Sequence, residues 1–417
     1  MILSAQVTYG ELPLREELTW VPRPEVFVSG EDMGETMAWL KRGGSDSEAM
    51  WEAFVRKVNV AIDESSQPYH GSDLVAFRYA AIGDATAVSD LALYYELTGD
   101  ETALAVAKQR LMIWAEVDPL PGSTISISHY PPRTDDSNMG VNRGINFAIP
   151  AAAFSNAYAL LYPYLNETER VEFRDWLLYL VSNVQFCFNL WVNNDFYDHQ
   201  AFNNHMTTHM LGLAASGAAL EDVGLLDFVY RNSNNPRRFE CLIEGVILTE
   251  AEGSEQLWYK DSSPEVQDGE IYDRYRIISL RNGKGSGLMY SMIQMRTLLL
   301  LSELARINKI DGWQHVGHNG ESLDLAFNFM APILLDENPA AQGEYYANDH
   351  LLTPVKEATV CYYHLARAHY PESLPISAVL EAFPGYYSDE EFMGFGLALL
   401  HQRPLTFTPE EHSENIE

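Results

Sequence analysis

The densest group of chemically useful side chains is the sequence Phe202-Asn203-Asn204-His205, which directly precedes an apolar stretch with helical spacing. Two amides and an imidazole at a loop-to-helix junction can converge on one anion, because amides donate hydrogen bonds and His205 can donate or remove a proton. The helix start adds partial positive charge. In the alternative interpretation Asn203 or Asn204 only caps the helix, since asparagine is a favoured cap residue.

A second group is the basic, glycine-spaced segment Arg281-Asn-Gly-Lys-Gly-Ser-Gly-Leu-Met-Tyr290. Its glycines allow the backbone to approach a ligand closely, and Arg281 and Lys284 can offset negative charge. Tyr290 falls near the first turn of the next helix, whose N-terminal dipole favours a phenolate. The segment is no phosphate loop, because Lys284 is followed by glycine. A flexible basic loop before a core tyrosine is the other interpretation.

Three histidines, His199, His205 and His209, could form a metal site. His205 and His209 are four residues apart, which places them on one helical face. The residues between them are Met-Thr-Thr, so the glutamate of a zinc-protease motif is missing. We therefore expect hydrogen-bonding histidines near a polar cleft, with no metal and no other cofactor.

The charge of the chain restricts its partners. Lys and Arg number 27 against 59 Asp and Glu, a net charge of −32, which disfavours nucleic acid and anionic membranes. Cations nevertheless cluster: Arg274, Arg276, Arg281 and Lys284 lie within eleven residues, and Arg133 and Arg143 flank an earlier irregular loop. Because distant charges are screened, this clustering predicts a locally positive cleft for an acidic polymer. Aromatic residues that could face sugar rings there are Trp191, Trp258, Tyr259, Tyr272 and Tyr275.

Amphipathic helices joined by short polar turns must position these residues. Helical spacing covers 85–97, 101–116, 147–161, 171–188, 207–219, 224–230, 285–307, 323–335, 355–370, 376–382 and 389–400. Recurring helical pairs without a fixed period predict a curved stack or closed ring of helical hairpins, all-α and in a single domain over 1–407. The irregular stretches 119–143, 190–204 and 252–284 would wall the site. A flexible acidic tail is expected over 408–417.

The three cysteines, Cys187, Cys241 and Cys361, have no metal-ligand spacing and are expected to be buried thiols. The first residues lack a basic segment followed by an apolar one, and no run of eighteen apolar residues follows. We expect a periplasmic or secreted protein whose leader is not part of this chain, or a cytoplasmic one.

Three motifs in the same order resemble the alginate lyase superfamily, which are helical-toroid polysaccharide lyases. They are the hairpin Tyr94-Tyr-Glu-Leu-Thr-Gly-Asp-Glu, the sequence Asn203-Asn204-His205 and the Arg281 to Tyr290 segment. The resemblance spans residues 81–305 and is closer to polysaccharide lyase family thirty-eight, which includes glucuronan and alginate lyases, than to family five. It implies an (α/α) toroid.

The resemblance also implies roles for these residues. Asn204, His205 and an arginine would neutralise a uronate carboxylate, and Tyr290 would move the proton. Arg281 is the first choice for the arginine, but it precedes Tyr290 by more residues than in family five, so Arg276 or Arg274 could replace it. The predicted substrate-binding residues are Asn203, Arg276, Arg274, Lys284, Trp258, Tyr259, Arg143 and Trp191.

The implied reaction is β-elimination in β-1,4-linked uronate polymers, glucuronan or polymannuronate, without a metal. Two other classes stay open. A uronyl hydrolase on an α/α barrel would use acidic residues such as Asp136, Asp195 or Asp268. A noncatalytic glycan-binding protein would need Trp258 and the arginines but not Tyr290.

Overall fold

The computed structural model describes residues 12–117, 143–193, 201–251, 266–273, 287–335, 353–385, 392–396 and 399, with the backbone alone for 353–358. Its helices are α1 (Gly30–Arg42), α2 (Ser45–Asp63), α3 (Leu74–Thr98), α4 (Glu101–Ala115), α5 (Arg143–Leu161), α6 (Glu167–Val192), α7 (Asn204–Ala219), α8 (Val223–Tyr230), α9 (Phe239–Val246), α10 (Gly287–Ile307), α11 (Leu323–Leu334), α12 (Thr353–His369) and α13 (Leu374–Ala382), with a short 3₁₀ turn, η2 (Tyr162–Tyr164). Within these ranges there is no β-strand, and an isolated bridge joins Ile247 to Ile271. The all-α prediction is confirmed.

Helices α3, α5 and α7 run parallel and side by side. Between α3 and α5, the Asn156 Nδ2 atom donates to Ser89 Oγ at 3.2 Å. Near the starts of both helices, the rings of Phe77 and Phe147 are in contact, with centroids 6.2 Å apart. Between α5 and α7, the hydroxyl oxygens of Ser155 and Ser216 lie 3.1 Å apart. Small residues let these helices approach closely. Because the helices run parallel, their N-termini lie at one end of the fold.

Helix α10 continues the parallel series beside α7. The Thr297 hydroxyl donates to the Thr207 hydroxyl at 2.7 Å, and Gln294, one turn nearer the start of α10, donates to the Phe202 carbonyl just before α7. The contacts thus advance along both helices in the same direction. The start of α10 therefore lies at the same end as the starts of α5 and α7.

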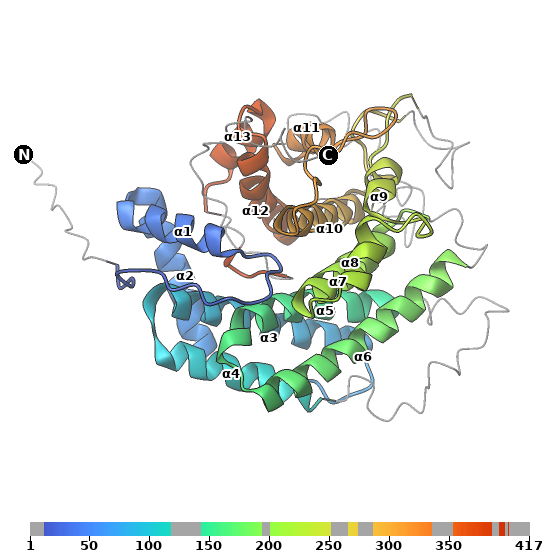
Figure 1. Cartoon of the computed structure of the whole chain (residues 1–417). Helices are drawn as coiled ribbons and strands as arrows, with labels where there is room; N and C mark the ends of the chain where they lie inside the picture. The colour runs from blue at the N-terminus through green and yellow to red at the C-terminus, as the bar shows by residue number, and fades with distance from the viewer. Residues whose placement is uncertain are drawn as a thin grey trace, which may run out of the picture.

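Outer helices run antiparallel to the inner ones. Gly99, in the left-handed conformation (φ 81°), ends α3, and Asp100 caps α4. Asn166 and Glu169 form a capping box at the start of α6. Figure 1 shows α4 and α6 outside α3, α5 and α7, and the helices following an arc round to α10 and α12. This arrangement is an (α/α) toroid.

Two helices that the periodicity did not predict, α1 and α2, help to close the arc with the C-terminal segment. The Thr36 hydroxyl of α1 donates to the Leu399 carbonyl at 3.0 Å, and the Phe395 amide donates to Asp90 of α3 at 2.8 Å. Helix α9 was not predicted either. Half of the predicted helix over 389–400 lies outside the described residues, and the predicted tail lies wholly outside them.

Helix α5 is apolar on nearly all sides because it has neighbours on all of them. Together with η2 it is long and apolar enough to cross a membrane, but 94% of its most apolar window is buried within the fold. That burial is typical of a core helix. Of the three cysteines, Cys187 and Cys361 are buried as predicted, whereas Cys241 is partly exposed.

A buried ion pair joins the first hairpin. Asp84 of α3 accepts from Arg110 Nη1 at 2.6 Å and from Trp114 Nε1 at 2.8 Å, and the side chains of the ion pair are less than a tenth exposed. Asp84→Ala would leave the buried guanidinium without its carboxylate, so we expect a loss of about 3–5 kcal/mol in the free energy of unfolding. Urea unfolding measures it. Asp175→Ala, which breaks an exposed pair with Arg174, should cost less than about 1 kcal/mol; equal losses would contradict the prediction.

Candidate active site

Helix α7 begins within the Asn203-Asn204-His205 sequence rather than after it. Asn203 is the N-cap, and its side-chain oxygen accepts from the His205 amide at 3.1 Å. The capping interpretation is therefore correct for Asn203. Asn204 and His205 belong to the first turn, three residues earlier than predicted, with Asn204 buried and His205 half-buried.

The packing of Phe202 holds this turn in place. Its ring packs so closely on Gly245 of α9 that a Cβ there would lie 2.4 Å from the ring. The Arg237 guanidinium lies over the same ring, 4.5 Å from its centroid, and donates to the Ala201 carbonyl at 2.6 Å. Tyr272 meets it edge-on at 6.0 Å between centroids. Tyr272 is 1% exposed, so its predicted place facing a sugar is wrong: it is a core residue.

Two buried polar residues fix the backbone of the turn. The Asn204 amide donates to Asp273 Oδ2 at 2.9 Å, and the Asp273 amide donates to Gln294 Oε1 at 3.3 Å. Gln294 in turn donates to the Phe202 carbonyl. Asp273 and Gln294 are fully buried. The start of α7 is thus tied both to the segment 266–273 and to α10.

The position of Tyr290 follows from that of Gln294. The two residues are four apart on α10, so they lie on the same helical face, about 6 Å apart along the axis. Since Gln294 reaches the turn before α7, Tyr290 lies on the side of α10 that faces the start of α7, in the first turn of its own helix. Tyr290 is half-buried. The structure therefore brings together the ends that carry Asn204, His205 and Tyr290.

Trp191 lies beneath His205. The two rings stack with centroids 4.8 Å apart and planes 19° apart. Trp191 is 4% exposed, which differs from the sugar-facing position that the sequence predicts. The reason is that α6 runs antiparallel to α5, so its last turn lies at the starts of α5 and α7. In this position Trp191 supports the His205 ring.

Arg143 is the first residue of α5, at the same end of the fold. It is half-buried, and burial lowers the pKa of its guanidinium, with an opposing effect from nearby Cys187. Burial raises the pKa of the Cys187 thiol to about 12. That thiol is therefore protonated at neutral pH and is no nucleophile. Arg143 thus remains a candidate cation for the site.

Several predicted residues lie outside the described ranges. These are Arg281, Arg274, Arg276, Lys284, Trp258 and Tyr259, together with His199 of the considered metal set. Among the residues that the structure does describe, no three His, Cys, Asp or Glu side chains are grouped to hold a metal ion. The sequence did not single out Phe202, Asp273 or Gln294 as supports of the site. The only sequence signal for Asp273 was its place directly before Arg274, one of the clustered cations.

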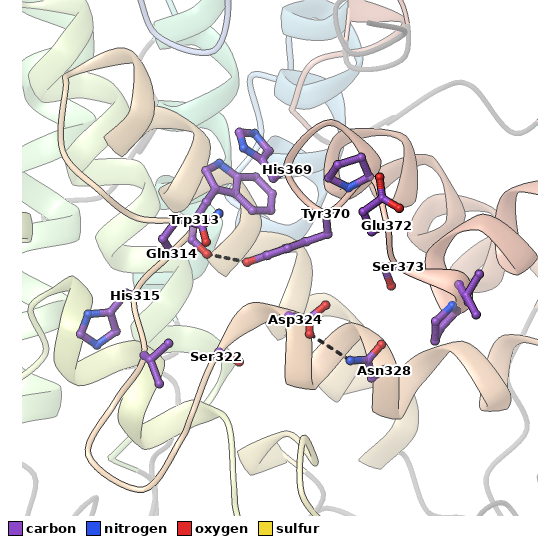
Figure 2. Close-up of a pocket in the computed structure, with 14 residues that line it drawn as sticks. Trp313, Gln314, His315, Ser322, Asp324, Asn328, His369, Tyr370, Glu372 and Ser373 are labelled. Carbon is purple, nitrogen blue, oxygen red and sulfur yellow. Dashed lines mark hydrogen bonds between the residues drawn. The ribbon is translucent and has the colours of Figure 1, made fainter. Parts of the chain in front are cut away.

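A pocket of about 710 Å³ lies at the other end of α10. Figure 2 shows Tyr370 crossing it, with its hydroxyl bonded to the Trp313 carbonyl, and Asp324 of α11 bonded to Asn328. Its lining includes Asp324 and Glu372 but no lysine or arginine. An acidic polymer would meet carboxylates there without cations to offset them. We therefore place the candidate active site at the starts of α7 and α10 and not in this pocket.

Parallel inner helices, antiparallel outer ones and a polar site at the inner N-termini define an (α/α) toroid, and known structures agree. Alginate lyase A1-III from Sphingomonas species A1 is similar with a TM-score of 0.59 and 14% identity, over 91% of this chain and 96% of that one. An alginate lyase from Bacteroides ovatus has a TM-score of 0.57 and 14% identity, over 91% and 99%. At such identities the likeness shows the fold alone.

A family model described as alginate lyase matches residues 59–340, more than half of the chain. The chain therefore belongs to the alginate lyase family, and the protein is a polysaccharide lyase. A search of curated proteins gives no match.

The hydrogen bond from the Asn204 amide to Asp273 leads to a prediction about lyase activity. Asp273→Ala leaves the buried Asn204 amide without an acceptor and frees the turn that carries His205, so we expect activity to fall about 10²-fold. Asp268→Ala is the matched control in the same segment. Asp268 is exposed and accepts only from the Glu250 amide, so this variant should keep nearly full activity. A severe loss with Asp268→Ala and none with Asp273→Ala would instead favour an acid-base role for Asp268.

Proposed function

We propose that the protein cleaves β-1,4-linked uronate polymers, glucuronan or polymannuronate, by β-elimination. The observation that supports this proposal is that α7 and α10 begin at the same end of the fold, in a member of the alginate lyase family. The first turn of α7 holds Asn204 and His205, and the first turn of α10 holds Tyr290. A relationship closest to polysaccharide lyase family thirty-eight belongs to the same proposal, as does a periplasmic or secreted location.

Neutralisation of the substrate carboxylate comes first. The C5 hydrogen of a uronate is a poor acid, because its removal places a second charge beside the carboxylate, and hydrogen bonds to that carboxylate stabilise the intermediate. The amides of Asn204 and His205 already bond to Asp273 and Asn203. The side chains must therefore hold the carboxylate. Asn204 is 2% exposed, so its hydrogen bond would form away from water, where it is stronger.

An arginine supplies the compensating charge. Arg281 is the first choice and Arg276 or Arg274 the alternative, with Arg143 a further cation at the same end of the fold. Arg274 directly follows Asp273, which is tied to the start of α7. This attachment supports a role for the 274–284 cations beside His205. Trp258, Tyr259 and Lys284 complete the proposed substrate contacts. Asn203, also predicted to bind substrate, is fully buried and acts by capping the turn that carries Asn204 and His205.

Tyr290 carries the proton. The reaction requires its phenolate form, which takes the proton from C5. The electron pair of that C–H bond forms the C4=C5 double bond as the C4–O4 bond breaks, and the tyrosine passes its proton to O4. Glucuronate and mannuronate place H5 and O4 on the same side, so one tyrosine serves as base and acid. Guluronate is inverted at C5 and would need His205 as its base.

The solved relatives support these residue types. A tetrasaccharide complex of alginate lyase A1-III with a tyrosine replaced by phenylalanine has a TM-score of 0.58 at 14% identity, and one with a histidine replaced by alanine has 0.56 at 16%. Those proteins bind an oligosaccharide. For this chain an acidic polysaccharide is the proposed ligand.

Tyr290→Phe tests the proposal. The wild-type protein is incubated with glucuronan, polymannuronate, polyguluronate and glycosaminoglycans, and elimination is followed by the ultraviolet absorbance of the new C4=C5 bond. Tyr290→Phe removes the proton carrier but keeps the ring, so turnover should fall by at least about 10²–10⁴-fold with binding nearly unchanged. Tyr94→Phe is the control, because Tyr94 is also half-buried but lies in the last turns of α3.

The other outcomes separate the alternatives. New reducing ends without ultraviolet absorbance would show a hydrolase, and binding without any cleavage would show a noncatalytic glycan-binding protein. Near-wild-type elimination by Tyr290→Phe would overturn the tyrosine mechanism.

A further inference from the structure

His209 is a fully buried histidine one turn after His205 on α7. Its ring meets the His205 ring edge-on, with centroids 6.2 Å apart and planes 81° apart. Neither ring nitrogen has a hydrogen-bond partner among the described residues. Burial lowers the pKa of His209 to about 3, so the ring is neutral at physiological pH. The mechanism proposed above makes no use of it.

A buried imidazole without partners is costly. An aliphatic side chain would fill the same space without leaving polar atoms away from water. The flat ring must therefore provide something that the fold of α7 alone does not need. The ring that it contacts, His205, has a proposed function.

Three helices shape the space around these two rings. Trp191 of α6 stacks on His205. Gly144 lies at the start of α5, and a Cβ atom on it would be 2.2 Å from His209 Nε2. Glycine at this position therefore makes room for the ring. His205 is thus supported by Trp191 on its face and by His209 at its edge contact, and His209 is itself backed by α5.

We propose that His209 is a positioning residue for His205. It fills the space between the start of α5 and the His205 ring and keeps that ring stacked on Trp191. The proposal rests on the proposed function, in which His205 binds the uronate carboxylate. Hydrogen bonds weaken steeply with angle, so a rotated His205 ring would stabilise the intermediate poorly even with the fold intact.

The first test needs no enzymatic activity. In protein carrying ¹³C-labelled histidine, the His205 Cε1–H signal, assigned with His205→Gln, is shifted by the ring current of Trp191. In His209→Ala we expect this signal to lose most of that shift. The control is Leu213→Ala, one turn further along α7 and equally buried, which should lower Tm and leave the signal in place. An unmoved signal in His209→Ala, or an equal movement in Leu213→Ala, would overturn the proposal.

The second test uses whichever polymer the wild type cleaves. His209→Ala should lower kcat about 10- to 100-fold with KM changed less than about threefold, because the carboxylate contact is stronger in the transition state. In a His205→Gln background the same change should have no further effect, since His209 acts through His205. A full additional loss there would show a merely structural role. If no polymer is cleaved, the proposed function fails, and the His205 signal still decides the role of His209.

Discussion

The parallel packing of the inner helices is the constraint on which the site depends. Because α5, α7 and α10 run in the same direction, their first turns lie at one end, and residues some 60 to 80 positions apart in sequence become neighbours. Helix N-termini also carry partial positive charge. An acidic chain with a net charge of −32 thereby presents one end suited to an anion. The pocket at the opposite end of α10 has carboxylates but no lysine or arginine in its lining, so it is less suited to an anion.

The reacting groups are held by residues that do no chemistry themselves. Phe202 is fixed by Gly245 and Arg237, the Asn204 amide by Asp273, and the turn by Gln294. Each of these contacts is buried or partly buried, so each restricts the motion of the turn. Preorganisation of this kind is what a reaction through a charged intermediate requires, since donors need not reorient as charge develops.

Two aromatic residues near the site are buried instead of lying open to a sugar ring. Trp191 and Tyr272 are covered by the protein, and they shape the site from behind through His205 and Phe202. In the proposed function, Trp258 and Tyr259, which lie outside the described residues, stack on the sugars. Support and contact are therefore divided between the helices and the irregular segments.

The sequence by itself determined most of the helices, their caps at Asp100, Asn166 and Asn203, and the candidate residues Asn204, His205 and Tyr290, because periodicity and capping are local properties. The prediction missed α1 and α2, although α1 carries local signals in the capping box of Ser29 and Asp32 and in its basic last turn. Nor did it show that Tyr272 and Trp191 are buried, or that Asp273 and Gln294 hold Asn204. Only the tertiary structure decided these, since exposure and hydrogen-bond partners depend on which distant elements pack together.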